Sequence, residues 1–132
     1  MISDEQKIRR LLAQWAQLYD DNDAAGWTML FAENGRFAVD APARNHVGRA
    51  AIRDYIDTQI ANAPAGRRTK HMCANAAIRF SGESAANADV DFVVYARRGD
   101  EPWSIISVGR YLNKLVRQNG EWLFLENLVT HP

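Results

Sequence analysis

Apolar residues in the first half of the chain recur every three to four positions, the spacing of one helix face. This spacing predicts a helix from about Asp4 to about Asp21, which Ser3 and Gln6 would begin as a capping box. It predicts a short second helix over Ala24–Ala32 and a third helix over about Arg49–Asn62. The first half is therefore expected to be mainly helical.

The second half follows the two-residue alternation of strands and is interrupted by turn residues. Asn119-Gly120 is the strongest turn signal, since both residues adopt the positive φ angles of a tight hairpin. A further strand over Arg36–Ala41 is expected between the second and third helices, entered by a turn at Asn34-Gly35 and followed by an irregular stretch. The late strands are expected over about Thr69–Phe80, Ala86–Arg98, Trp103–Arg117 and Glu121–His131.

Helices followed by antiparallel strands predict one α+β domain over residues 1–132. The simplest packing is a cone-shaped, curved antiparallel sheet wrapped around the three N-terminal helices. Such a sheet cannot fill its own concavity, so we expect an apolar pocket that takes a small ligand.

Composition and net charge argue against several classes of function. The 16 basic residues balance 16 acidic ones, which argues against binding to nucleic acid or to an anionic membrane. The single cysteine, Cys73, excludes a disulfide framework and a multi-cysteine metal site. The chain has no apolar run of membrane-spanning length and no signal peptide at its start, so we expect a soluble, cytoplasmic protein.

No phosphate loop, nucleophile elbow or zinc-helix motif is present, so the candidates are individual titratable or polar side chains. The first candidate site lies at the end of the first helix. Tyr19 lies on the apolar face, where its hydroxyl needs a partner. Asp20 lies off that stripe near the helix C-terminus, where the helix dipole disfavours an anion and a protonated histidine would stabilise it. The alternative is a solvated helix end.

The second candidate site is the strand that begins near His71. Alternation places His71, Cys73 and Asn75 on one face, where they could line a pocket. Histidine is the natural general base near neutral pH, and a carboxylate partner would fix its tautomer. The alternative is an exposed sheet face, and Cys73 is interpreted as a small apolar filler.

The later strands carry polar side chains of less certain role. Tyr95 and Tyr111 could present hydroxyls to a substrate carbonyl, or be half-buried sheet residues. Asp89 and Asp91 are expected to be solvated. His46 and His131 have no metal-ligating companions, so no metal site is expected.

These residues resemble the SnoaL-like domains of the nuclear transport factor 2-like superfamily over nearly the whole chain. The resemblance is nearest to the branch that contains scytalone dehydratase, bile-acid dehydratase and hexachlorocyclohexane dehydrochlorinase. The matching segments are Leu18-Tyr19-Asp20, Gly26-Trp27, Leu30-Phe31-Ala32, Gly35-Arg36-Phe37, Gly48 to Ile52, His71 to Asn75 and Asn119 to Trp122.

The resemblance implies that Asp20 and His71 form a catalytic dyad that needs no metal or organic cofactor, and that Tyr19 matches the tyrosine before the aspartate. A second pocket tyrosine of the fungal dehydratase would fall near Val39, which cannot donate a hydrogen bond, and its pocket asparagine near Tyr111. Ketosteroid isomerase shares the fold, but its catalytic aspartate would also fall near Val39. Asp40, one residue later, points to the opposite face of a regular strand.

The leading hypothesis is a dehydratase-like lyase or isomerase acting on a small apolar or polycyclic substrate. His71 would remove a proton, Asp20 would orient it and Tyr19 would bind the developing oxyanion. The alternatives are a non-catalytic small-molecule-binding protein, a ketosteroid-isomerase-like enzyme and a structural protein like a dioxygenase small subunit. By resemblance we expect a homodimer or homotrimer. The expected substrate-binding residues are Trp27, Phe31, Phe37, Val39, Asn75, Tyr95 and Tyr111.

Overall fold

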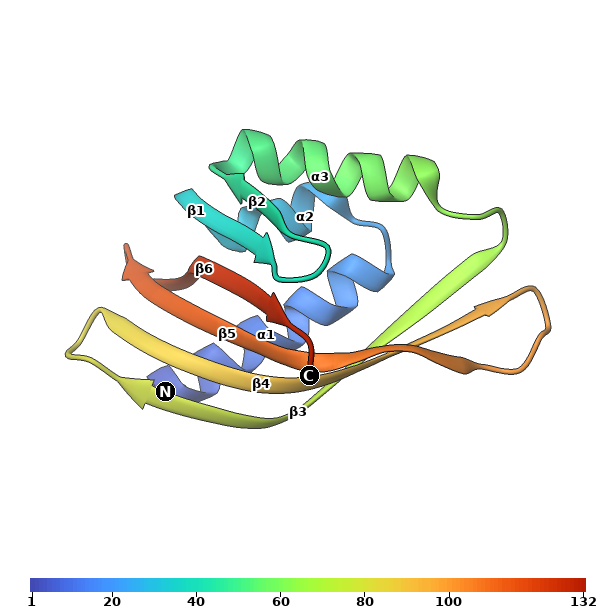
Figure 1. Cartoon of the computed structure of the whole chain (residues 1–132). Helices are drawn as coiled ribbons and strands as arrows, with labels where there is room; N and C mark the ends of the chain where they lie inside the picture. The colour runs from blue at the N-terminus through green and yellow to red at the C-terminus, as the bar shows by residue number, and fades with distance from the viewer.

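The computed structural model describes residues 1–132 and contains three helices and a six-stranded curved sheet (Figure 1). This confirms the predicted α+β class. None of the three helices combines the length and the hydropathy that a membrane span requires. The elements in chain order are α1 (Asp4–Asp20), α2 (Ala24–Met29), β1 (Phe31–Val39), β2 (Arg44–Val47), α3 (Arg49–Asn62), β3 (Arg67–Phe80), β4 (Ala85–Arg98), β5 (Ser104–Gln118) and β6 (Glu121–Thr130).

The sheet is mixed rather than wholly antiparallel. Its strand order is β2-β1-β6-β5-β4-β3. Neighbouring strands are antiparallel except β1 and β6, which run parallel, with Phe37 opposite Asn127. Alternation within a strand defines its two faces but not its partner or its direction, so the expected all-antiparallel sheet is corrected at this pair.

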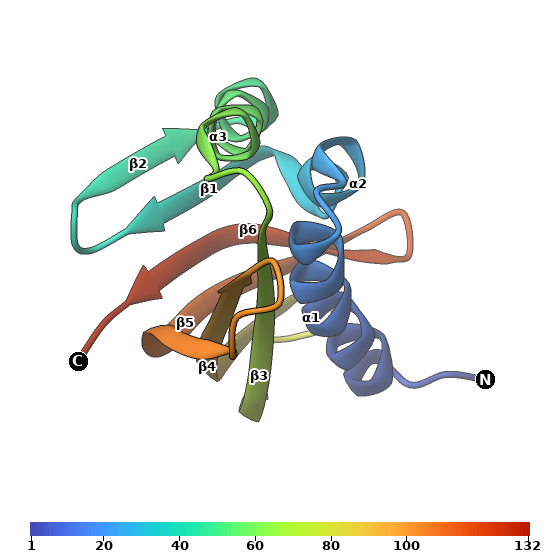
Figure 2. The same ribbon diagram turned by 90° about the vertical axis from the view of Figure 1, so that its right-hand side faces the viewer.

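Helix α1 lies against the concave side of the sheet, and α3 covers its β1–β2 end (Figure 2). The apolar face of α1 includes Ile8, Leu11 and Trp15, all buried. Every second residue of β4 from Ala86 to Ala96 is buried as well. The helix face and the sheet face predicted from periodicity therefore form one common core.

The helix starts agree with their predicted capping residues. The Ser3 hydroxyl accepts the Gln6 backbone N–H at 3.1 Å, and the Gln6 side chain accepts the Ser3 backbone N–H at 2.9 Å. This confirms the capping box. Asp23 likewise accepts the Gly26 backbone N–H at 2.8 Å at the start of α2.

The region between α2 and α3 differs from the prediction. Helix α2 ends at Met29, and Phe31 already belongs to β1 instead of the helix. Asn34-Gly35 is no turn, since it lies inside β1 where the register against β6 shifts between Phe31 and Arg36. A β-carbon on Gly35 would lie 3.0 Å from the backbone oxygen of Phe124, so glycine suits this close approach. The stretch expected to be irregular contains β2.

Candidate active site

A cavity of about 810 Å³ opens between the C-terminal end of α1, helix α3 and the concave face of the sheet. Its walls combine aromatic and aliphatic side chains with a small set of polar groups, the usual composition of a small-molecule site. The apolar lining includes Trp15, Phe37, Val39, Ile56, Phe92, Val94 and Val129.

Asp20 and His71 meet on the wall of this cavity. Asp20 is the last residue of α1, and His71 lies near the start of β3. The Asp20 Oδ1 atom lies 2.5 Å from His71 Nδ1, and Oδ2 accepts the His71 backbone N–H at 2.8 Å. The Thr69 hydroxyl donates to Oδ1 at 3.0 Å. Both side chains are largely buried, with 10% of Asp20 and 9% of His71 exposed.

These contacts determine how the imidazole is presented. A carboxylate only accepts hydrogen bonds, so its short contact places a proton on His71 Nδ1, and in the neutral imidazole the lone pair then lies on Nε2. No protein group bonds to Nε2. The donors from β3 also satisfy the Asp20 carboxylate at the helix end where the dipole disfavours it. The pair has the form of a base held by an orienting carboxylate.

Two aromatic rings hold the imidazole in place. The Tyr19 ring lies 4.9 Å from the His71 ring, and the Trp15 ring lies 5.5 Å from it, both edge-on. Tyr19 and Trp15 are themselves stacked at 5.5 Å with an angle of 8° between their planes. The imidazole therefore has little room to rotate away from Asp20.

A buried polar network fixes Trp15 from behind. Its indole N–H donates to Asn127 Oδ1 at 3.1 Å, and the Asn127 amide donates to Asn113 Oδ1 at 2.6 Å. Asn127 and Asn113 are paired neighbours on β6 and β5, and both are almost fully buried. The network links the middle of the sheet to the ring beside His71.

The substitution Asn127→Ala should lower the free energy of unfolding by about 2 to 4 kcal/mol, because it leaves the Trp15 N–H and the Asn113 oxygen buried without partners. Urea unfolding followed by tryptophan fluorescence measures the loss. Asn45→Ala is the matched control, since Asn45 is exposed, and it should change the value by less than about 0.5 kcal/mol. Equal stabilities of the two variants would contradict the role given to the network.

The tyrosine hydroxyls of the cavity remain protonated. Burial raises the pKa of Tyr19 well above its usual range, and the neighbouring Tyr55 raises it further. Burial also raises the pKa of Tyr55 and that of Tyr111. Tyr55 on α3 was not among the expected site residues. It lines the cavity, and its hydroxyl can donate a hydrogen bond there.

Three of the seven expected substrate-binding residues line the cavity, namely Phe37, Val39 and Tyr111. Trp27 and Phe31 do not line it, since both are fully buried behind the wall. The Trp27 ring packs 5.4 Å from Tyr19 and 5.5 Å from Phe37. These two residues support the wall instead of forming it.

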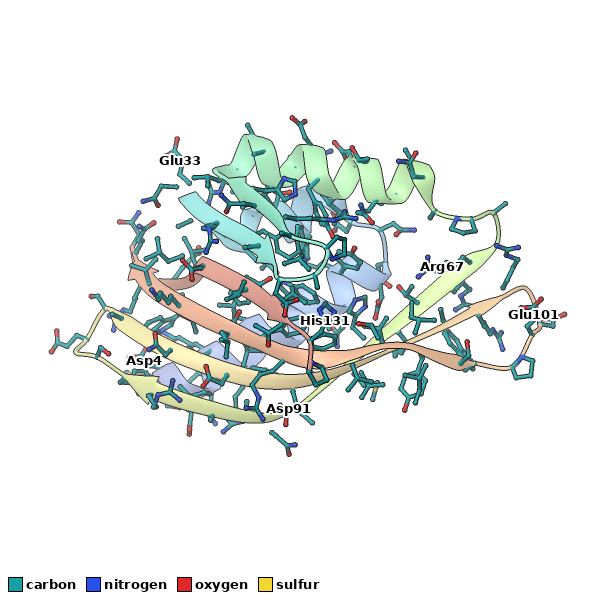
Figure 3. All side chains as sticks on the ribbon, viewed as in Figure 1. Asp4, Glu33, Arg67, Asp91, Glu101 and His131 are labelled. Atoms are coloured by element: carbon teal, nitrogen blue, oxygen red, sulfur yellow. The ribbon has the colours of Figure 1, made fainter.

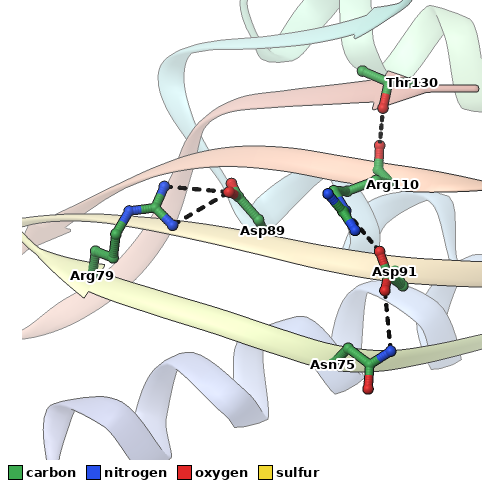
Figure 4. Close-up of polar contacts among 6 residues, drawn as sticks. All are labelled: Asn75, Arg79, Asp89, Asp91, Arg110 and Thr130. Carbon is green, nitrogen blue, oxygen red and sulfur yellow. Dashed lines mark hydrogen bonds and ion pairs between the residues drawn. The ribbon is translucent and has the colours of Figure 1, made fainter.

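Asn75 lies outside the cavity, on the convex side of the sheet. β3 has a register shift between Ala74 and Ala77, and Asn75 itself adopts a φ of 56°. This irregularity ends the alternation that begins at His71, and the Asn75 amide donates to Asp91 at 3.0 Å (Figure 4). The expected face shared by His71 and Asn75 is therefore corrected.

Tyr95 also lies on the convex side, because it alternates with the buried residues Val94 and Ala96 of β4. It is absent from the cavity wall. Asp89 and Asp91 are partly exposed on this side and are paired with Arg79 and Arg110 (Figure 4). These groups belong to the outer surface of the sheet.

The remaining candidates have other roles. Burial, followed by the charge of Asp20, raises the pKa of the Cys73 thiol to about 11, so the thiol is not a nucleophile near neutral pH. Asp40 does not line the cavity, and it contacts the ring Nδ1 of His131 at 2.7 Å. The backbone N–H and ring of His131 lower the pKa of Asp40. No group of three or more His, Cys, Asp or Glu side chains is placed to hold a metal ion.

The chain matches one protein-family model and is similar in fold to several solved structures. The family model described as the SnoaL-like domain matches residues 1–126. A search of curated protein sequences finds no match. Among solved structures, an NTF2-like protein with a cystatin-like fold from Novosphingobium aromaticivorans is 27% identical, with a TM-score of 0.83. The alignment covers 97% of this chain and 81% of that one.

Two further structures from the same organism share the fold. A candidate scytalone dehydratase is 23% identical with a TM-score of 0.82, over 96% of this chain and 82% of that one. The β subunit of a candidate aromatic-ring-hydroxylating dioxygenase is 18% identical with a TM-score of 0.80, over 94% of this chain and 86% of that one. At these identities the likeness concerns the fold alone.

Proposed function

This chain belongs to the SnoaL-like domain family, and we propose that it is a cofactor-independent lyase or isomerase acting on a small, largely apolar cyclic substrate. His71 removes a proton from a carbon next to a carbonyl or a leaving group. Asp20 orients the imidazole and stabilises the imidazolium that forms. The observation that supports this most is the 2.5 Å contact between Asp20 and His71, made on the wall of a cavity with Nε2 left free.

The reaction needs a base and a hydrogen-bond donor for the oxygen that gains charge. His71 Nε2 takes the proton, and the C–H electron pair forms the new double bond. In an elimination the imidazolium returns that proton to the leaving oxygen, so water departs. In an isomerisation it returns the proton to another carbon. A placed base contributes roughly 10²- to 10⁴-fold in rate.

The protonated phenols supply the donors. Tyr19 and Tyr55 both line the cavity, and their hydroxyls can bind a developing oxyanion. Tyr111 lines the same cavity and forms no hydrogen bond to another side chain through its hydroxyl. A donor aimed at an oxyanion in a dry site contributes on the order of a few kcal/mol to the transition state.

A non-catalytic binding protein is the main alternative function. Such a protein would keep the cavity and use His71 only as part of its wall. The ketosteroid-isomerase-like function receives less support, because Asp40 contacts His131 and does not line the cavity. A role as a structural subunit rests on likeness of fold alone.

A neutral bicyclic probe, 5-nitrobenzisoxazole, tests proton abstraction without knowledge of the natural substrate. A base removes the C–H proton of its isoxazole ring, the C–H electron pair forms a nitrile, and the N–O bond breaks to give a coloured nitrophenolate. We expect saturable opening by the wild-type protein, at least about 100-fold faster than by free imidazole at equal concentration and pH. Absorbance stopped-flow or plate-reader kinetics measure the rate. A rate no greater than that of imidazole, with the probe bound, would favour the binding protein.

A further inference from the structure

The mouth of the cavity is positively charged, although the whole chain has a formal net charge of zero. Among the lining residues, the only acidic ones are Asp20 and Asp21, and Asp20 is engaged by His71. The lining residues with permanent positive charge are Arg44, Arg67, Arg68 and Lys70. The excess of positive charge is therefore concentrated at this opening.

None of the three lining arginines has an acidic partner. Arg44, Arg67 and Arg68 form no ion pair, although all three are exposed. Six of the ten arginines outside the cavity wall are paired with carboxylates. The paired arginines are Arg9, Arg36, Arg53, Arg79, Arg110 and Arg117.

Arg44 faces the cavity from β2. It is paired in register with Val39, so the two side chains lie on the same face of the sheet, and Val39 lines the cavity. The Arg44 guanidinium lies 5.9 Å from the centre of the Tyr55 ring. Its charge lowers the pKa of Tyr55 and of Tyr19, in each case opposing the larger effect of burial. The positive charge of Arg44 therefore acts on the hydroxyls of Tyr55 and Tyr19 in the cavity.

Arg67 faces the same space from β3. It is the first residue of that strand and alternates onto the face that carries Thr69 and His71. Like Arg44, it acts on Tyr19 by lowering the pKa of the phenol against the effect of burial. The two guanidiniums thus approach the phenol beside His71 from different strands.

Further arginines next to Arg67 add to the positive charge at this end of β3. Arg67 is paired in register with Arg98, and the next residue, Arg68, with Arg97. Like charges opposite one another on neighbouring strands are destabilising. Glu101 lies in the connection between β4 and β5 (Figure 3), and neither it nor these four arginines belong to any of the ion pairs. A bound anion would relieve this repulsion.

We propose that the substrate of this site carries an anionic group beside its ring system, and that Arg44 and Arg67 bind that group at the mouth while the reacting carbon lies over His71. The inference rests on the proposed function for the role of His71. Guanidinium groups suit the role because they stay charged at every working pH and bind planar anions such as carboxylates in a bidentate manner.

A matched pair of ligands tests this inference by binding alone. 2-Naphthoate and 2-naphthamide have the same ring system and nearly the same shape, but only the first is charged. We expect the wild-type protein to bind 2-naphthoate at least about 10-fold more tightly at low ionic strength, and the difference to shrink as salt is added. Isothermal titration calorimetry measures both dissociation constants.

Two double variants separate a local site from overall charge. Arg44→Gln with Arg67→Gln should abolish the preference for the acid. Arg79→Gln with Arg110→Gln removes the same charge from the outer face of the sheet (Figure 4) and should keep the preference. Equal affinities for acid and amide in the wild type, or a preference that survives the loss of Arg44 and Arg67, would overturn the inference. The proposed function is tested separately by the wild-type kinetics with 5-nitrobenzisoxazole, because this probe carries no anionic group.

Discussion

His71→Gln is expected to slow the opening of 5-nitrobenzisoxazole by at least about 100-fold in kcat/KM. The reason is that His71 Nε2 is the free basic nitrogen of the Asp20–His71 contact, and a glutamine amide cannot take up a proton at neutral pH. Glutamine is similar in length and polar, so it can keep a hydrogen bond to Asp20 and spare the packing beside Trp15 and Tyr19.

The measurement is steady-state kinetics of the variant and the wild type at the same pH, with the thermal unfolding midpoint recorded for each. A variant that is folded and loses the activity supports His71 as the base. A folded variant that opens the probe within about threefold of the wild type would remove His71 from the mechanism, and the proposed function with it.

Asp20→Asn is expected to cost on the order of 10²- to 10⁴-fold in the same assay, with little change in side-chain size. An asparagine amide can donate to His71 Nδ1, which favours the tautomer that carries its proton on Nε2 and so blocks the base. The amide also cannot stabilise the imidazolium by charge. Asp89→Asn is the control, because it makes the same substitution at an exposed carboxylate on the convex side of the sheet.

Two readouts distinguish orientation of the imidazole from a merely structural role of Asp20. The ¹⁵N chemical shifts of the His71 ring should report a proton on Nδ1 in the wild type and on Nε2 in Asp20→Asn. The double variant Asp20→Asn with His71→Gln should be no slower than His71→Gln alone, because residues that act as one unit are not additive. Additive losses, or an unchanged tautomer, would contradict the dyad.

The sequence was most informative where a property depends on neighbouring residues. Hydrophobic spacing predicted α1, α3 and the four long strands, with boundaries within two residues of those observed. The same spacing predicted a strand only from Arg36, whereas β1 begins at Phe31, because Asn34-Gly35 resembles a turn but lies at a register shift inside the strand. It also failed at Asn75, whose positive φ lies at a break in the alternation of β3. A one-residue irregularity moves the following side chains to the other face.

For the candidate site as well, some features could be predicted from the sequence and others could not. Asp20 and His71 were singled out from their positions and from the family resemblance, and the structure brings them into contact across 51 residues of chain. Tyr55 carried only the signal of an inner helix face, shared with its apolar neighbours. Trp27 and Phe31 were expected to line the pocket, but whether a buried aromatic residue forms a cavity wall or lies behind it depends on the packing of several elements.

By itself, the amino-acid sequence determined the order of helices and strands and the faces that would be buried, because these properties follow from local geometry and side-chain chemistry. Asp20 and His71 were singled out by their chemistry together with the family resemblance. Only the tertiary structure decided that β1 runs parallel to β6, and that Tyr55, Arg44 and Arg67 line one cavity. Those outcomes depend on contacts between distant segments, which the spacing of residues along one segment cannot encode.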